Sequence, residues 1–224
     1  MDFLDDHSAE KGDICDECLS GFDRLSHPFC TICGVPFKSK VEEDHLCEKC
    51  LRKRPYYDLL RAPYLYEDKI MDAVHLIKYS GKSTILKTLG PLLGAFVKDL
   101  IGDTKDMVLI PVPLHKKKLK QRGFNQSVLI AKAVSAFIGA EPELYTLTRI
   151  KYTESQTGLS LEQRRKNVKG AFEVRGDKVI HGKTVILVDD VATTGNTVNE
   201  CARMLKKAGS KKVYGLVLAR TAAY

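Results

Sequence analysis

Apolar residues along the chain follow two patterns that alternate from one end to the other. Short apolar runs, typical of buried strands, cover residues 62–66, 107–112, 144–147, 184–188 and 212–219. Between them, apolar residues recur every three or four positions, as in amphipathic helices, over residues 70–78, 124–137 and 197–208. Strands that alternate with helices predict an α/β fold with a mostly parallel sheet.

A further helical stretch contains two start signals. Ser83 is a good N-cap for one helix, and Pro91 is expected to start a second helical segment. The Ser-Gly-Lys-Ser sequence at 80–83 shares its last three residues with the phosphate-binding P-loop. That motif needs glycine where this chain has Leu76, so we exclude a P-loop NTPase.

Residues 149–170 form a polar, basic segment that is unusually long for a connector inside a compact domain. Such loops are often lids that close over a ligand, so we expect a lid here. In parallel sheets, ligands bind where the strands end at their carboxyl side. Three polar segments follow predicted strands and are therefore candidate ligand-binding segments, namely residues 113–118, 149–155 and 189–195.

The chain has 224 residues, 44% of them hydrophobic, which is enough for one domain plus a small module. A membrane-spanning helix needs about 20 consecutive apolar residues, and no such run is present, so we expect no membrane insertion. The N-terminal segment, from Met1 to Asp13, is acidic and polar, unlike a secretory signal, which has a basic start and an apolar middle. We therefore expect a cytoplasmic protein whose thiols stay reduced.

Charge is spread unevenly along the chain, whose net charge is +8. Residues 1–50 carry 5 Lys and Arg against 12 Asp and Glu, whereas residues 51–224 carry 31 against 16. A basic body favours an anionic partner such as phosphate, a nucleotide or nucleic acid. Ordinary lysine-rich helix faces would give the same composition, so charge alone leaves both explanations open.

Six of the seven cysteines lie in the first 50 residues, as three C-x-x-C pairs. The second pair ends at Cys33 and the third begins at Cys47, a spacing close to that of a zinc ribbon, in which four thiolates hold one tetrahedral metal. Gly34 suits the tight turn that follows the second pair. We expect a structural Zn²⁺ on these two pairs, Cys30, Cys33, Cys47 and Cys50.

The first pair, Cys15 and Cys18, could serve in several ways. It could bind metal together with the second pair, or form half of another site completed by His7, His27 or an acid. It could also carry redox chemistry or form a disulfide, although nothing around the pair resembles a thioredoxin-like helix start. Cys201, alone in a helical pattern, is expected to be a small core residue.

Two adjacent carboxylates, Asp189 and Asp190, follow the most apolar predicted strand and precede a turn rich in Thr and Gly. Backbone N–H groups of such a turn, together with the helix dipole, make an anion site, and Gly195 lets the backbone approach the ligand closely. The carboxylates would then accept hydrogen bonds from hydroxyls near the anion, as in a ribose 5-phosphate. The alternative is that Asp190 only caps the helix and Asp189 is solvated.

The run at 185–197 resembles the fingerprint of type I phosphoribosyltransferases, which bind phosphoribosyl pyrophosphate (PRPP). Together with this run and the zinc-ribbon cysteines, four other stretches resemble a narrower group, the ComF/ComFC family. These stretches are residues 110–115, 122–126, 153–156 and 164–172. The resemblance implies a type I phosphoribosyltransferase fold over residues 55–224, preceded by a zinc-ribbon module over residues 1–54.

Members of this family couple a double zinc ribbon to a phosphoribosyltransferase-like domain. They are linked to natural competence, in the handling of incoming single-stranded DNA. Family members often carry four C-x-x-C pairs, whereas this chain has three. By that comparison Cys15 and Cys18 are the remaining half of the first ribbon, which supports the zinc assignment to the other two pairs.

The resemblance implies a role for each part of the 185–197 run. The loop that would hold the 5-phosphate of PRPP consists of Ala192, Thr193, Thr194, Gly195, Asn196 and Thr197. Asp189 and Asp190 would bind the ribose hydroxyls just before it. The implied reaction displaces pyrophosphate at C1 of the ribose through an oxocarbenium-like state, with a nitrogenous acceptor.

Basic segments would handle the pyrophosphate. Residues 113–117, which include His115 and Lys116, would bind it, and Mg²⁺ would bridge it to the ribose with few protein ligands. Arg164 and Arg165 of the lid, helped by Lys166, would neutralise it as it leaves. The catalytic residues expected from the resemblance are therefore Asp189, Asp190, Arg164 and Arg165.

A different class of function is a non-catalytic accessory protein that binds single-stranded DNA and uses the PRPP fold as a sensor or scaffold. Its support is the basic body, with runs at 116–122 and 164–169. Four tyrosines could also stack on bases, namely Tyr56, Tyr57, Tyr64 and Tyr66. Such tyrosines are more often packing residues. The candidate partners are thus PRPP, single-stranded DNA and other competence proteins.

Overall fold

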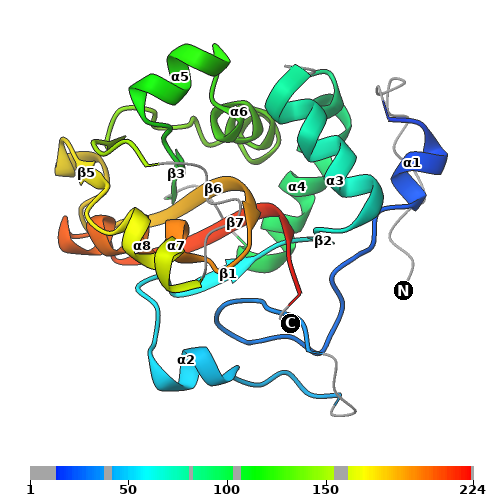
Figure 1. Ribbon diagram of the computed structural model, residues 1–224, viewed down its shortest axis with the longest axis horizontal. Helices are drawn as coiled ribbons and strands as arrows, with labels where there is room; N and C mark the ends of the chain where they lie inside the picture. Colours follow the sequence, from blue (N-terminus) through cyan, green and yellow to red (C-terminus); the bar gives the residue numbers. More distant parts are fainter. Residues whose placement is uncertain (1–13, 38–41, 81–82, 103–106, 154–160, 223–224) are drawn as a thin grey trace.

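The computed structural model describes residues 14–37, 42–80, 83–102, 107–153 and 161–222. Five parallel strands form its main sheet (Figure 1), namely β1 (Leu59–Arg61), β2 (Tyr64–Leu65), β3 (Met107–Pro111), β6 (Thr184–Ala192) and β7 (Lys212–Arg220). Their order is β1-β7-β6-β3, and β2 pairs with β7 beyond the end of β1. The predicted α/β fold with a parallel sheet is confirmed.

Helices cover both faces of this sheet (Figure 1). One face carries α3 (Asp68–His75), the π-helical turn η1 (Leu76–Ser80), α4 (Ile85–Ile101) and α6 (Gln126–Ile138). The other face carries α8 (Asn196–Lys207) and the cysteine-rich segment. Side chains alternate along a strand, so Ile186 and Val188 of β6 pack with the first group, whereas Val185 and Leu187 pack with the second.

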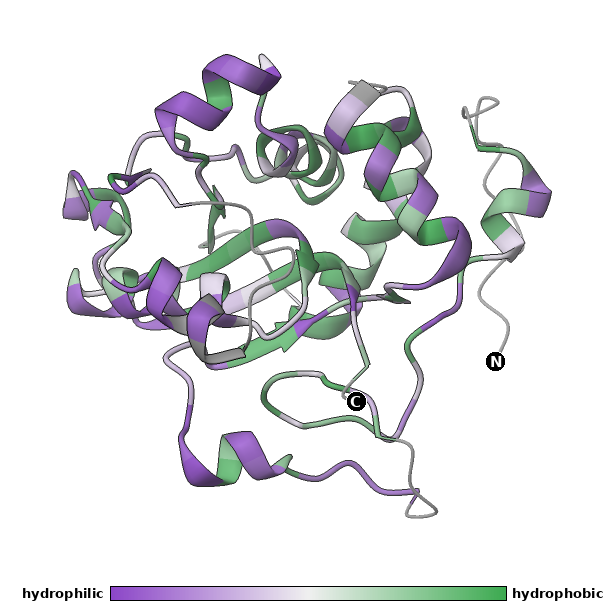
Figure 2. Cartoon of the chain, viewed as in Figure 1, coloured by the Kyte–Doolittle hydropathy of each residue, from purple (hydrophilic) through white to green (hydrophobic). Residues whose placement is uncertain are grey.

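The remaining helices are short and lie around this core. They are α1 (Asp16–Ser20), α2 (Glu48–Arg52), α5 (Lys116–Arg122), α7 (Leu161–Val168) and the 3-10 turn η2 (Asp177–Val179). Figure 2 shows that the strands of the main sheet are largely hydrophobic, whereas α5 is almost entirely hydrophilic. In the described part of the chain, no helix is both long enough and apolar enough to cross a membrane.

Two predicted strands lie elsewhere than expected. The apolar run at 62–66 contributes only the two residues of β2, and β1 lies just before the run. Pro63, which has no N–H to donate, separates the two strands where each pairs with β7. The run at 144–147 contributes only Leu147 to β4 (Leu147–Arg149). β4 pairs antiparallel with β5 (Phe172–Val174), outside the main sheet. The segment after β4 therefore does not start at the carboxyl edge of the main sheet.

The helix α4 corrects another expectation, since it runs without a break through Pro91. Its glycines pack tightly on α6. A Cβ atom added to Gly90 would lie 2.8 Å from the Cβ atom of Ala133. One added to Gly94 would lie 2.5 Å from the Cδ1 atom of Phe137. This close helix contact compensates for the intrahelical hydrogen bond that Pro91 cannot donate.

The cysteine-rich segment packs directly against the main sheet. The N–H group of Leu60 in β1 donates to the carbonyl oxygen of Ile32 at 2.8 Å. The buried guanidinium of Arg61 donates to the carbonyl oxygens of Cys30, Thr31 and Ile32. The buried cysteines of the segment belong to the same hydrophobic cluster as β6 and α8. The ribbon therefore shares a core with the sheet.

Candidate functional site

Two adjacent carboxylates, Asp189 and Asp190, lie near the carboxyl end of β6, and both are buried. The Oδ1 atom of Asp189 accepts hydrogen bonds from the Ser127 hydroxyl, at 2.8 Å, and from the N–H group of Asp190. Oδ1 of Asp190 accepts from the N–H group of Val191, and Oδ2 lies 2.8 Å from Nζ of Lys78. Because β6 continues through both acids, the expectation that they follow the strand is corrected.

Burial changes the ionisation of these groups. Burial first, and then the charge of Asp190, raise the pKa of Asp189 to about 7, although the hydrogen bond from Ser127 opposes the shift. Burial alone would lower the pKa of Lys78, but the charge of Asp190 outweighs it and raises this pKa. Asp189 is not solvated, and the N-cap residue of α8 is Gly195. The alternative of a capping acid beside a solvated one is therefore wrong.

Lys78 is a site residue that sequence reasoning missed. It lies in η1, a π-helical turn that directly continues α3. Turns of this kind are rare and are frequently found at functional sites. The helical pattern at 70–78 marked Lys78 only as the end of an amphipathic helix, and nothing in the sequence linked it to Asp190. Ser127, in the first turn of α6, was missed for the same reason.

The predicted phosphate loop, residues 192–197, connects β6 to α8. Ala192 ends the strand, Gly195 has a positive φ of 72°, and Asn196 is the first residue of the helix. The hydroxyl oxygen of Thr194 accepts a hydrogen bond from the N–H group of Asn196 at 3.4 Å. The loop therefore lies at the N-terminus of a helix of 12 residues, whose dipole and N–H groups favour an anion.

The predicted pyrophosphate residues, His115 and Lys116, lie where β3 leads into α5. His115 is the N-cap of α5, and its Nδ1 atom accepts from the N–H group of Lys117 at 3.2 Å. The basic run that follows is helical, with Lys116 as its first residue. Tyr152 covers this start, since its ring centroid lies 5.5 Å from that of His115 and 5.3 Å from Nζ of Lys117. The first part of the 149–170 segment thus contacts α5.

Arg149, at the end of β4, is a further cation that sequence reasoning did not assign. Its guanidinium lies over the ring of Phe172, 5.3 Å from the centroid, and donates to the hydroxyl of Thr153. Its buried Nε atom has no hydrogen-bond partner among the described residues. Burial lowers the pKa of Arg149, and the charge of Asp189 opposes that shift. Arg149 therefore brings a positive charge near the acid pair.

The predicted catalytic arginines, Arg164 and Arg165, lie in α7, but their side chains are outside those described. Residues 154–160 are also outside the described part of the chain. The end of this segment is fixed to α8, because the N–H group of Gly170 donates to Oε1 of Glu200 at 2.7 Å. Closure of the segment over the site stays a prediction.

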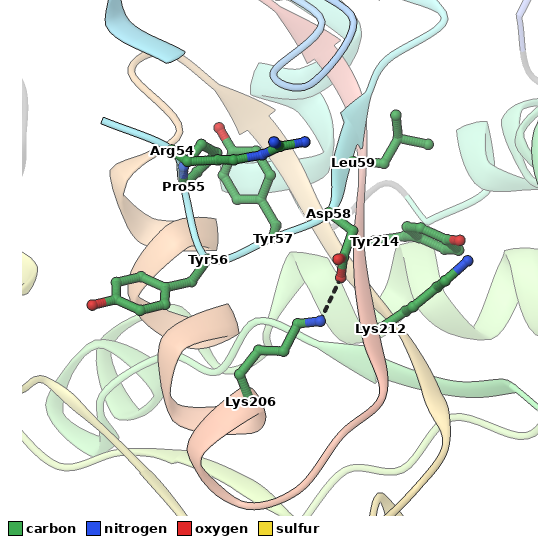
Figure 3. A pocket seen from close by; sticks show the side chains of 9 residues that line it. All are labelled: Arg54, Pro55, Tyr56, Tyr57, Asp58, Leu59, Lys206, Lys212 and Tyr214. Carbon is green, nitrogen blue, oxygen red and sulfur yellow. Dashed lines mark ion pairs between the residues drawn. The ribbon is translucent and has the colours of Figure 1, made fainter. Parts of the chain in front are cut away.

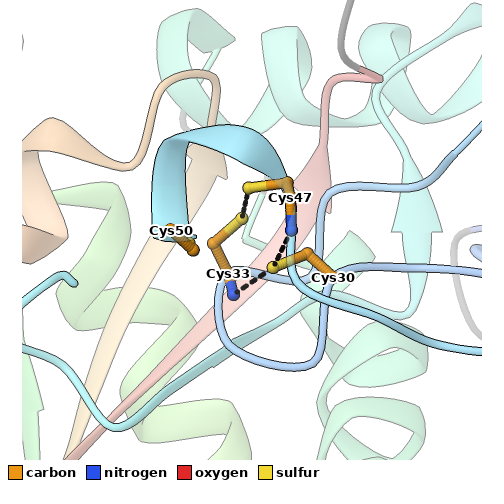
Figure 4. A group of neighbouring side chains, drawn as sticks. All are labelled: Cys30, Cys33, Cys47 and Cys50. Carbon is orange, nitrogen blue, oxygen red and sulfur yellow. Dashed lines mark hydrogen bonds between the residues drawn. The ribbon is translucent and has the colours of Figure 1, made fainter. Parts of the chain in front are cut away.

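Four cysteine sulfurs converge where the ribbon meets the sheet (Figure 4). The Sγ atoms of Cys30, Cys33, Cys47 and Cys50 all lie within 4.8 Å of one another, and those of Cys33 and Cys47 are 3.7 Å apart. Zn–S bonds of about 2.3 Å in a tetrahedron place sulfurs about 3.8 Å apart, so the set fits Zn²⁺. Burial would raise the pKa of Cys30, but N–H donors from Cys47 and Cys33 lower it to about 6.

Known proteins resemble this chain over nearly its whole length. Residues 125–224 match the phosphoribosyl transferase domain, and residues 5–51 match the double zinc ribbon domain. Competence protein F of Haemophilus influenzae is 31% identical over 96% of this chain and 93% of its own length. The chain belongs to the competence protein F (ComF) family. The predicted family, the type I phosphoribosyltransferase fold and the zinc ribbon are thereby confirmed.

Other ComF-family relatives carry names that refer to DNA utilization or to competence. The DNA utilization protein YhgH of Escherichia coli K12 is 32% identical over 93% of this chain and 90% of its own length. Competence protein ComFC of Bacillus subtilis is 27% identical over 93% of this chain and 84% of its own length. The matches extend over both the ribbon and the phosphoribosyl transferase domain.

In this ComF-family chain, the first cysteine pair stands apart from the metal cluster. Cys15 and Cys18 lie at the start of α1, which packs on the α3 side of the sheet. Figure 1 shows α1 on a different side of the molecule from α2, the helix that contains Cys50. Both thiols are free, so neither a shared site with the second pair nor a disulfide is present among the described residues. Nδ1 of His27 lies 2.9 Å from Oδ1 of Asp44 instead. His7 is outside the described residues.

A groove of about 690 Å³ lies at the other edge of the sheet, where β1 and β7 begin and α8 ends (Figure 3). Its lining is basic and aromatic, and consists of Arg54, Pro55, Tyr56, Tyr57, Asp58, Leu59, Lys206, Lys212 and Tyr214. Tyr56 is 47% exposed, whereas Tyr57 and Tyr64 are buried. The packing interpretation therefore holds for the two buried tyrosines, and Tyr56 remains available for stacking.

Proposed function

We propose that this protein binds PRPP together with Mg²⁺ in the cytoplasm and transfers its phosphoribosyl group to a nitrogenous acceptor. The observation that carries the proposal is the adjacency of Asp189 and Asp190 to the loop 192–197 at the start of α8. A phosphorylated sugar is a ligand that uses both an anion site and nearby hydroxyl acceptors. The phosphoribosyl transferase domain match over this region supports the same ligand class.

Ligand binding would redistribute the contacts of the buried acid pair. Ser127 holds Asp189 in one orientation, and Lys78 neutralises Asp190. Ribose hydroxyls would donate to the two carboxylates, and Lys78 would turn toward the phosphates of the ligand. Carboxylates close to C1 would then stabilise the positive charge that develops there as pyrophosphate leaves.

Cations of α5 and β4, outside the acid pair and the loop 192–197, would compensate the negative charge of pyrophosphate. Lys116, at the start of α5, and the partly buried guanidinium of Arg149 are the described candidates. Arg164 and Arg165 would join them when the 149–170 segment closes and excludes water. Mg²⁺ would be held chiefly by oxygens of PRPP and by water, and would neutralise the phosphates.

Calorimetry with PRPP and Mg²⁺ tests this function. We expect the Asp189→Asn/Asp190→Asn variant to bind PRPP about 100-fold more weakly than the wild type, because each carboxylate loses charge-assisted hydrogen bonds to the ribose. Asp177→Asn, an exposed acid at the start of η2, is the matched control and should bind normally. A wild-type protein that binds no PRPP at millimolar ligand rules the proposal out.

The biological setting that we propose is DNA uptake or DNA utilisation, in contact with other competence proteins. Its support is the names of the relatives, which refer to competence and DNA utilization. A second candidate function, binding of single-stranded DNA, is favoured by the basic and aromatic groove. Arg54 and Lys212 would contact phosphates there, and Tyr56 and Tyr214 would stack on bases.

Fluorescence anisotropy with a labelled oligothymidine tests the second function. We expect Tyr56→Ala to weaken binding about 10-fold through loss of stacking. Tyr145→Ala removes a tyrosine that is 80% exposed outside the groove and should have no effect. Arg54→Ala/Lys212→Ala should also reduce the salt dependence of binding, by about one to two counterions. Equal affinities for the two tyrosine variants would exclude the groove.

A further inference from the structure

A lysine of the zinc ribbon reaches the phosphate loop. Lys49 lies in α2, between the zinc-binding residues Cys47 and Cys50. Its Nζ atom donates a hydrogen bond of 2.6 Å to the carbonyl oxygen of Thr194, which is 145 residues away in the chain. Ordering a lysine side chain costs rotamer entropy, and among the described residues Lys49 makes no ion pair that would explain its position.

The contact fixes the direction of one particular peptide group. In a trans peptide, the carbonyl oxygen and the following N–H group point to opposite sides. The bond between Thr194 and Gly195 is trans. Because the carbonyl oxygen of Thr194 points toward the ribbon, the N–H group of Gly195 points away from it. Lys49 therefore holds the loop from the side opposite to this N–H group, which is a natural donor to an anion.

Other groups pack behind the same loop. A Cβ atom added to Gly195 would lie 3.2 Å from the hydroxyl of Tyr57 and 3.3 Å from Cδ2 of Leu60. It would also lie 3.9 Å from Nη1 of Arg220, a guanidinium that is only 3% exposed. The Nε and Nη1 atoms of Arg220 make no hydrogen bond within the described part of the chain. The back of the loop thus rests on the ribbon, on the connector that follows it and on a buried cation.

We propose that Lys49 is a positioning residue for the phosphate group of the ligand, and that the zinc ribbon is thereby part of the binding site. The inference rests on the proposed function, in which the loop 192–197 holds the 5-phosphate. Zn²⁺ on Cys47 and Cys50 would keep α2 in place, and α2 would keep the Gly195 N–H group directed at the ligand. Because linkage is reciprocal, the phosphorylated ligand would also strengthen metal retention.

The binding test uses full-length, zinc-loaded protein and three probes, which are PRPP with Mg²⁺, ribose 5-phosphate, and pyrophosphate with Mg²⁺. We expect Lys49→Met to weaken binding of PRPP and ribose 5-phosphate about 10-fold, through loss of a charged hydrogen bond that orients the loop. Pyrophosphate should bind unchanged, because it would contact α5 instead. Lys49→Arg should restore affinity, and Lys53→Met, just after α2, should match the wild type.

Two outcomes of this test overturn the inference. One is Lys49→Met protein that retains its zinc and binds ribose 5-phosphate as tightly as the wild type. The other is an equal loss of affinity for all three probes, or loss of zinc, since either would show a general structural defect. The selective loss, with rescue by arginine, is the result that only a positioning role predicts.

Amide hydrogen exchange separates this inference from the proposed function. In ligand-free protein, we expect the peptide covering residues 193–198 to exchange faster in Lys49→Met than in the wild type or in Lys53→Met. If the wild type binds no sugar phosphate, the proposed function fails, and this measurement still decides whether Lys49 orders the loop. Equal exchange in all three proteins would show that it does not.

Discussion

Lys78 and Asp190 form a buried ion pair across the candidate site, with Nζ 2.8 Å from Oδ2. The side chains are 20% and 8% exposed, so the pair is largely removed from water. Asp190 comes from β6, whereas Lys78 comes from the π-helical turn after α3. The negative charge of Asp190 is therefore already neutralised by Lys78 before any ligand binds.

Loss of Lys78 should destabilise the fold by leaving a buried carboxylate without its counter-charge. We expect Lys78→Met to lower the free energy of unfolding by about 2 kcal/mol, less than for a fully buried pair because the lysine keeps some exposure. The double variant Lys78→Met/Asp190→Asn should recover most of this loss, to within about 1 kcal/mol of the wild type. Urea denaturation measures both. Equal destabilisation of the single and double variants would contradict an energetic coupling between the two residues.

Asp189 should make stability depend on pH. Its pKa is raised from 3.8 to about 7 by burial and by the charge of Asp190. The folded protein holds this proton more tightly than the unfolded chain, so the contribution of Asp189 is fully present below about pH 4 and is lost as pH rises through 7. Relative to Asp189→Asn, the wild type should lose unfolding free energy from about pH 4 to about pH 7 and then level off. Parallel stability curves for the two proteins, from urea titrations, would show that Asp189 does not titrate in this window.

Gly195 should be needed both for its backbone and for its small size. Its φ is 72°, and an added Cβ would press on Tyr57 and Leu60. Gly176 has a similar φ of 76° with open space around it, and is the matched control. We expect Gly176→Ala to cost about 1 kcal/mol, from left-handed strain alone. Gly195→Ala should cost more and also weaken PRPP binding. Similar stabilities and affinities for both variants would argue against close packing behind the loop.

Metal analysis should find about one zinc per chain, held by the second and third cysteine pairs. We expect Cys33→Ser to lose the metal and to lower the thermal midpoint strongly, since binding energy of a structural zinc is folding energy. Cys15→Ser/Cys18→Ser should keep its zinc. Two zincs in the wild type, with one lost in the Cys15/Cys18 variant, would show that the first pair binds metal.

Features that depend on local periodicity could be predicted from the sequence, and contacts between distant segments could not. The apolar run before Asp189 predicted β6, and the cysteine spacing predicted the cluster that the structure brings together. Lys78 lies far from Asp190 along the chain, and Lys49 is 145 residues from Thr194. Lys78 ends an ordinary helical pattern, and Lys49 lies between two zinc-ribbon cysteines, so only the folded chain reveals what each lysine contacts.

Local chemistry also misled the sequence interpretation where tertiary packing outweighed it. Pro91 is a strong helix-start signal, yet close packing of Gly90 and Gly94 on α6 keeps α4 continuous. The paired acids looked like groups that emerge at the end of a strand. They are buried instead, because Ser127 and Lys78 arrive from other elements to satisfy them.

The contact between the ribbon and β1 has a consequence for solubility. β1 is an outer strand of the main sheet. Its Leu60 N–H group and its Arg61 guanidinium donate hydrogen bonds to carbonyl oxygens of residues 30–32, in the turn that holds Cys30. An uncovered outer strand offers unpaired N–H and C=O groups to strands of other molecules. The turn that carries Cys30 pairs with the N–H group of Leu60 and covers this edge. If zinc holds that turn in place, a chain stripped of its zinc should self-associate before it unfolds.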